Sequence, residues 1–163
     1  MKKLTLQILV LAIISIGGLT TAAIAQEKTR EANIYLLKTG ETNADYPFGL
    51  VAVKRQVERR SPLRSALEIL TNGATAEEEE KQNLASSTWG IKLVSVRIKN
   101  RTAYTYFTMP DEARFSGDGA PFIFGEAVRK TAMQFPNVKR VVVCLDGILD
   151  FGSEDDAPPK RCR

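Results

Sequence analysis

The sequence predicts an α+β domain, in which two main helices pack on one face of a mixed or mostly antiparallel sheet that contains a β-hairpin. Two segments carry apolar residues at helical spacing, and the segments around them alternate or run apolar over strand-like lengths. The chain has 163 residues, which is enough for one domain with its own core. We assign the domain to residues 33–147, between a polar leader at 26–32 and a polar tail at 148–163.

The domain is predicted to begin with two strands and a helix. Residues 33–37 are rich in strand formers, and residues 50–58 alternate apolar and polar positions. Ser61-Pro62 predicts a helix start with Ser61 as its cap, and Asn72-Gly73 predicts its end. The apolar stripe of this helix consists of Leu63, Ala66, Leu67 and Leu70.

A short helix and a hairpin are predicted next. Thr75 and Glu78 have the spacing of a capping box, which starts a second helix running through Leu84. Residues 91–98 and 102–108 are strand-like and flank a turn at Lys99-Asn100-Arg101. On the first of these strands, one face is expected to carry Val94, Val96 and Ile98.

The last helix and strand have the clearest patterns. The helix begins at Pro121 and ends at Pro136, and the strand at residues 138–145 is nearly continuous in β-branched residues. Such a strand is expected to be central and buried on both faces. Asp146-Gly147 closes it with a turn. The helix stripe consists of Phe124, Ala127, Val128, Thr131 and Phe135.

Residues 1–25 have the pattern of a secretory signal peptide. A positive start at Met1-Lys2-Lys3 precedes an uncharged, mostly apolar stretch and the small-residue exit Ala23-Ile24-Ala25. We therefore predict cleavage between Ala25 and Gln26, with retention as an N-terminal anchor as the alternative. No later stretch approaches the roughly 20 apolar residues of a membrane span, so the mature form is predicted to have no transmembrane segment. The expected location is the periplasm, the cell wall or the extracellular space.

The charge balance argues against nucleic acid as a partner. The chain has 23 basic and 19 acidic residues, a net charge of +4, and cleavage would remove Lys2 and Lys3 but no acid. A nearly balanced exported domain lacks the strongly basic character of nucleic-acid binders. One local basic cluster is either a solvated face or a surface for an anionic wall polymer or lipid headgroup. It consists of Lys54, Arg55, Arg59, Arg60 and Arg64.

Two cysteines, Cys144 and Cys162, remain in the exported chain. An even number of cysteines in an oxidising compartment favours a disulfide, with two free thiols as the alternative. The bridge would tie the polar tail to the last predicted strand. Because no C-x-x-C motif is present, we expect a structural bridge.

Several ordered blocks of the sequence resemble the GerMN domain family. They are the helix block at 61–73, the linker blocks at 80–86 and 90–93, and the closing block at 127–138 with its following strand. The resemblance covers residues 32–147. It implies an exported, non-catalytic envelope module of a family named from sporulation and spore germination, and it carries over no catalytic residue.

Three segments depart from the family pattern. Trp89 stands where proline is usual, and Lys99-Asn100-Arg101 lacks the usual Asp-Gly turn. Tyr104-Thr105-Tyr106 occupies a strand where an acid is common. These departures argue against a germination role in particular.

The composition excludes several classes of enzyme. The chain has no histidine, so it can form neither a Ser-His nor a Cys-His dyad, and its two cysteines are too few for an all-Cys zinc site. We therefore predict no catalytic, cofactor-binding or metal-binding residues. A carboxylate-dependent peptidoglycan hydrolase is the enzyme alternative, although no spacing singles out a pair among Asp111, Glu112, Asp118 and Glu126. The acids near the C-terminal end lack the ordered spacing of an EF-hand calcium loop. They are Asp146, Asp150, Glu154, Asp155 and Asp156.

We predict a binding or assembly module whose partner is an envelope protein or a peptidoglycan or other glycan strand. Aromatic side chains supply large contact areas for such partners, and cross-strand packing is their alternative role. A structural homo-oligomer that pairs through a sheet edge is the third hypothesis. The candidate partner-binding residues are Trp89, Tyr104, Tyr106, Arg59 and Arg60.

Overall fold

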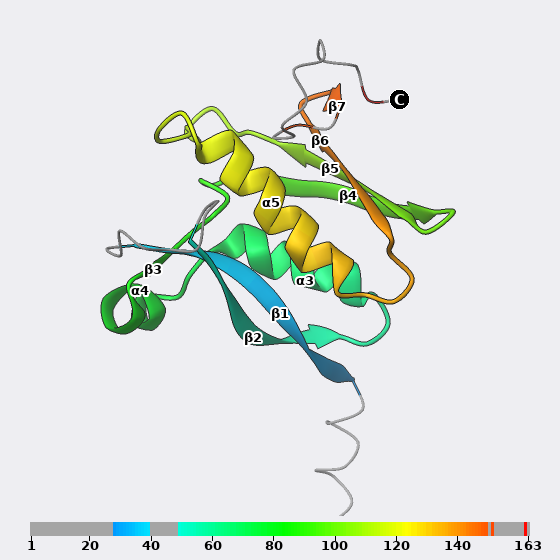
Figure 1. Cartoon of the computed structure of the whole chain (residues 1–163), viewed down its shortest axis with the longest axis horizontal. Helices are drawn as coiled ribbons and strands as arrows, with labels where there is room; N and C mark the ends of the chain where they lie inside the picture. Colours follow the sequence, from blue (N-terminus) through cyan, green and yellow to red (C-terminus); the bar gives the residue numbers. More distant parts are fainter. Residues whose placement is uncertain (1–27, 40–48, 150, 152–161, 163) are drawn as a thin grey trace, which may run out of the picture.

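Helices α3 (Pro62–Asn72) and α5 (Ala120–Met133) lie between two separate sheets, as Figure 1 shows. The computed structural model describes residues 28–39, 49–149, 151 and 162. The predicted signal peptide, its cleavage site and most of the polar tail lie outside these residues. In the described part of the chain, no helix is long and apolar enough to span a membrane.

The first sheet has the strand order β2-β1-β3 and is antiparallel. Strand β1 (Thr29–Lys38) pairs along its length with β2 (Leu50–Glu58), and its last residues pair with β3 (Leu84–Ala85). Strand β1 begins earlier than predicted, because residues assigned to the polar leader pair with the end of β2.

The second sheet has the strand order β4-β5-β6-β7 and is mixed. Strands β4 (Lys92–Lys99) and β5 (Thr102–Thr108) form the predicted hairpin, and β6 (Arg140–Leu145) runs parallel to β5. Strand β7 (Ile148–Leu149) pairs with β6 and belongs to the segment predicted as tail. The predicted α+β class is thus confirmed, and the division into two sheets is a feature that the sequence did not indicate.

One continuous core joins the two sheets through the helices. Strand β1 contributes Ile34 and Leu36, α3 contributes its predicted stripe, and α5 contributes Phe124 and Val128. From the second sheet, the core includes Ala103, Phe107, Val141, Val143 and Leu145. Both helices therefore bury apolar side chains toward both sheets. The face of the second sheet that packs on the helices is its inner face, and the opposite face is its outer face.

The helix ends follow local sequence signals with one exception. In α4 (Ala76–Gln82), Thr75 and Glu78 form the predicted capping box, but the helix ends before Leu84, which belongs to β3. Gly73 ends α3 with a φ of 77°, as predicted from a glycine at that position. Ser61 occupies the predicted N-cap position before Pro62, and its carbonyl accepts a hydrogen bond from Ser65 N–H, but its side chain makes no capping hydrogen bond.

A β-bulge changes the predicted face of β4. The pairing with β5 shifts between Leu93 and Ser95, so Val94 is 55% exposed instead of sharing a face with Val96. The hairpin turn places both Asn100 and Arg101 at positive φ, the conformation of a primed two-residue turn. Strand β6 lies between β5 and β7, with Val143 buried on the core side and Cys144 on the outer side, but the predicted burial of both faces is incomplete because Arg140 is exposed and Val142 is half-buried.

Before its short pairing with β3, the edge of β1 that faces away from β2 is covered by Thr131 of α5 and by Gln134, the residue after this helix. Asn33 N–H donates to Gln134 Oε1 over 2.8 Å, and Gln134 Nε2 donates to Asn33 O over 2.7 Å. Tyr35 N–H donates to Thr131 Oγ1. The Gln134 amide thus replaces a neighbouring strand at this position and satisfies backbone groups that burial would otherwise leave unpaired.

Replacing Gln134 by alanine is expected to lower the free energy of unfolding by about 1–3 kcal/mol, because it leaves the Asn33 backbone groups without partners. Urea unfolding measures this change. Gln56→Ala on the exposed face of β2 is the control, with an expected change within about 0.5 kcal/mol. Equal effects of the two substitutions would contradict a special role for Gln134.

Candidate functional site

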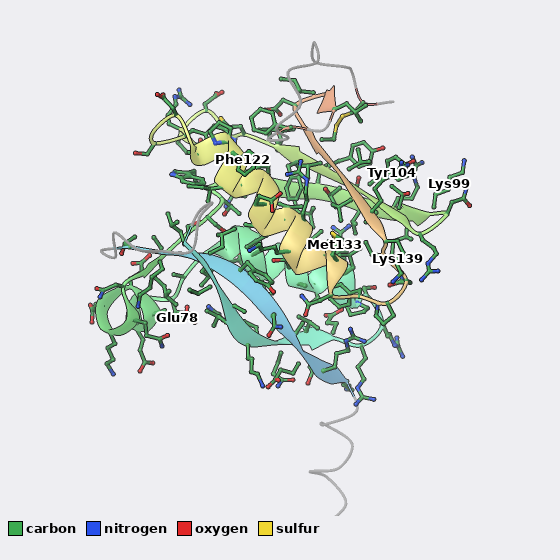
Figure 2. All side chains as sticks on the ribbon, in the orientation of Figure 1. Glu78, Lys99, Tyr104, Phe122, Met133 and Lys139 are labelled. Atoms are coloured by element: carbon green, nitrogen blue, oxygen red, sulfur yellow. A yellow bond between two sulfur atoms is a disulfide. The ribbon has the colours of Figure 1, made fainter. Side chains whose placement is uncertain are left out.

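The outer face of the second sheet brings two of the predicted aromatic residues together. Along β5, Ala103 and Phe107 point into the core, so the alternation of a strand places Tyr104 and Tyr106 on the opposite face. Both tyrosines are half-buried. Figure 2 shows Tyr104 on the side of this sheet that faces away from the first sheet.

Arg97 on β4 connects the two tyrosines. It is the cross-strand partner of Tyr104, and its guanidinium carbon lies 5.8 Å from the centre of the Tyr104 ring. Its Nη2 also donates a long hydrogen bond of 3.5 Å to the Tyr106 hydroxyl. We call Arg97, Tyr104 and Tyr106 the tyrosine face. An open hollow of about 420 Å³ beside it is lined by Ser95, Val96, Arg97 and Tyr106.

Two further cations flank the tyrosine face. Lys99 and Arg140 lie in the adjacent row, because both pair with Thr102, Lys99 from β4 and Arg140 from β6. Residues two apart on a strand share a face, so Lys99 lies on the same side as Arg97, and Arg140 on the same side as Cys144. Figure 2 shows Lys99 close to Tyr104 at the hairpin end of the sheet.

The disulfide lies on the same outer face. Cys144 is the parallel-strand partner of Tyr106, and it is bonded to Cys162. Cys162 N–H donates to Gly147 O over 2.8 Å. The end of the chain is therefore attached beside Tyr106, and Cys144 is buried although it points away from the core.

Trp89 lies apart from the tyrosine face. It precedes β4, and its ring packs edge-to-face on Phe115 with the ring centres 5.7 Å apart. Phe115 in turn stacks on Phe151 and contacts Phe124 of α5. The Trp89 side chain is half-buried against the core, so its contacts are those of a packing residue.

The basic cluster noted in the sequence is largely paired with acids. Arg64 forms an ion pair with Glu68 one turn along α3. Lys54 pairs with Glu31 across the β1–β2 ladder, and this hydrogen bond raises the pKa of Lys54. Arg59 donates through Nε to the Thr29 carbonyl, while Arg60 is exposed.

Arg55 and Glu78 join β2 to the start of α4. Arg55 Nη2 lies 2.5 Å from Glu78 Oε2, and both side chains are mostly buried. The same Glu78 oxygen accepts the Thr75 N–H of the capping box. This pair is a structural contact that leaves only 22% of the Arg55 side chain exposed.

The acidic residues considered as a catalytic pair of a hydrolase differ in their contacts and exposure. Glu126 pairs with Arg129 within α5, while Asp111, Glu112 and Asp118 are exposed in the loop before that helix. Asp146 accepts hydrogen bonds from the Thr108 hydroxyl and the Met109 N–H. Among the described residues, no group of three or more Cys, Asp or Glu side chains is placed to share a metal ion. Asp150, Glu154, Asp155 and Asp156 lie outside them.

Comparison with known proteins gives a family and a fold. The family described as Germane: Sporulation and spore germination matches residues 33–149. The first GerMN domain of the sporulation protein GerM from Bacillus subtilis is similar, with 19% identity and a TM-score of 0.53, covering 83% of this chain and 95% of that domain.

The tandem GerMN domains of the same protein are also similar, with 19% identity and a TM-score of 0.52. The match covers 74% of this chain, which spans only 40% of the tandem structure. A comparison with curated protein sequences gives no match. The chain belongs to the Germane family of sporulation and spore germination, and residues 33–149 form a GerMN-like domain.

Proposed function

We propose that the protein acts outside the cytoplasmic membrane as a non-catalytic binding or assembly module of the cell envelope, with the tyrosine face as its contact surface. The predicted signal peptide supports export, and the Cys144–Cys162 bridge agrees with an oxidising compartment. The observation that carries the proposal is the pair of outward tyrosines joined by Arg97 beside an open hollow. Tyr and Arg, together with Trp, are the residue types enriched at binding hot spots.

Co-sedimentation of the mature protein with isolated peptidoglycan sacculi tests this proposal. We expect Tyr104→Ala to weaken binding about 5- to 30-fold, since truncating a hot-spot aromatic costs about 1–2 kcal/mol. Met133→Ala, an exposed apolar residue on α5, is the matched control and should bind like the wild type. No sedimentation of the wild type with sacculi, together with no cross-linked envelope protein in the native cell, would contradict the proposal.

The same incubation separates the module from a hydrolase. A binding module leaves the sacculi intact over long incubation. Release of soluble muropeptides by the purified protein would instead support the carboxylate-dependent hydrolase.

A structural oligomer is the second candidate, and the edge of β2 favours it. Strand β2 pairs with β1 without a bulge over its whole length and is the outermost strand of its sheet. An unpaired edge can accept another strand. Light scattering that rises in mass with protein concentration would support self-association, and a constant monomer mass would exclude it.

A further inference from the structure

We infer that the tyrosine face, together with Lys99 and Arg140, binds an anionic glycan, a polymer of sugar residues that carry carboxylate or phosphate groups. This inference rests on the proposed binding function and adds the chemical class of the ligand. Its basis is a group of cations on the outer face of the second sheet that form no ion pair with any of the described residues.

Strands β4 and β6 contain basic residues, and none of the three main strands of this sheet contains an acid. Their sequences are KLVSVRIK for β4, TAYTYFT for β5 and RVVVCL for β6. The nearest acid along β6 is Asp146, which follows the strand and accepts hydrogen bonds from Thr108 and Met109. Like charges without acidic neighbours raise the local potential and attract anions.

The cations on this face differ from the basic cluster of the first sheet in their ion pairing with described residues. Within the described part of the chain, no salt bridge joins Arg97, Lys99 or Arg140 to an acid. The basic cluster between β2 and α3 is different, because Lys54 and Arg64 have carboxylate partners there. The second sheet therefore presents a group of cations without acidic partners among the described residues, and it brings them together from segments far apart in the sequence.

The spacing of the cations suits a polymer better than a single small anion. Arg97 and Lys99 are two residues apart on β4, about 7 Å, and Arg140 lies two strands away from Lys99, about 10 Å. One small anion cannot contact all three at once. A chain with repeated anionic groups can, and each added contact then benefits from a high effective concentration.

The two tyrosines favour sugars over the other anionic partners. Tyr104 and Tyr106 offer ring surface with a polar tip, which suits the mixed apolar and hydroxyl surface of a sugar ring. A membrane surface would require an apolar face to insert, but β4 exposes only the apolar side chains of Val94 and Ile98 among the polar residues Lys92, Ser95, Arg97 and Lys99. The predicted export of the chain argues against nucleic acid.

Binding of the mature protein to polygalacturonate, measured by calorimetry at low and high salt, tests the inference. We expect binding that weakens as salt rises, and little binding to neutral dextran. The variant Arg97→Gln/Lys99→Gln/Arg140→Gln should bind at least tenfold more weakly. The control variant Lys28→Gln/Arg59→Gln/Arg60→Gln loses the same number of charges elsewhere and should bind within about twofold of the wild type. Both variants should unfold at the wild-type temperature, since all six residues are exposed.

The outcomes separate this inference from the proposed function. Equal weakening by the two triple variants, or equal binding of dextran and polygalacturonate, would overturn the anionic-glycan inference while sacculus binding could still stand. Tighter binding to polyglutamate, to an oligo-dT strand or to anionic lipid vesicles would overturn it in favour of a peptide, nucleic-acid or membrane partner. Failure to bind sacculi or any envelope protein would contradict the proposed function itself.

Discussion

Replacing Phe124 by alanine is expected to lower the free energy of unfolding by about 3–5 kcal/mol, the usual cost of emptying a buried aromatic site. Phe124 is fully buried on α5, where its ring packs edge-to-face on the ring of Phe107 with the ring centres 5.2 Å apart. It also contacts Phe115 and Phe151, so one side chain joins the second sheet, the loop before α5 and the end of the described domain.

Chemical denaturation of Phe124→Ala measures this loss directly. Met133→Ala on the same helix is the matched control, because Met133 is 53% exposed and its truncation should change stability by less than about 0.5 kcal/mol. A loss below about 1 kcal/mol for Phe124→Ala would mean that the contacts of Phe124 with the other phenylalanines do not hold α5 to the second sheet.

Loss of the Cys144–Cys162 disulfide is expected to cost about 3 kcal/mol, the chain-entropy value for a loop of this size. The two cysteines are separated by 18 positions in the sequence. Cys144 is buried on β6 beside Tyr106, so the substitution Cys162→Ser removes the bridge without emptying the site on the strand.

Thermal unfolding with and without reductant checks this prediction. Reductant should lower the melting temperature of the wild type to that of Cys162→Ser, and it should leave the variant unchanged. Alkylation of both cysteines in the native protein without reduction, seen as a mass increase, would contradict the bridge.

The sequence indicated most elements of the fold because their signals are local. Thr75 and Glu78 lie within one helical turn, and the glycine that ends α3 follows its apolar stripe directly. The two-sheet arrangement depends on contacts between distant segments. The hydrogen bonds between Gln134 and Asn33 span 101 positions in the sequence. No local sequence pattern predicts that the side-chain amide of Gln134 takes the place of a neighbouring strand.

The candidate site was predictable in part for the same reason. Alternation along β5 places Tyr104 and Tyr106 on one face, and hairpin register brings Arg97 across from Tyr104. Arg140 joins them only through the parallel pairing of β5 with β6, which α5 separates in sequence. Trp89 shares their aromatic character, but its packing on Phe115 could not be inferred from residue type.

The basic cluster shows how sequence proximity misleads about charge. Arg55 and Arg64 are close in sequence to Arg59 and Arg60, but their partners Glu78 and Glu68 neutralise them. The cations of the second sheet are dispersed over two strands and form no visible cluster in the sequence.

Mapping the ligand contact by amide chemical shifts tests the central claim most directly. Polygalacturonate added to the ¹⁵N-labelled mature protein should shift the amide signals of Arg97, Lys99, Tyr104, Tyr106 and Arg140 most strongly. Signals of the β2–α3 segment around Arg59 and Arg60 should stay in place. Shifts confined to that segment or to the surroundings of Trp89, with the tyrosine face unchanged, would contradict the assignment of the binding surface.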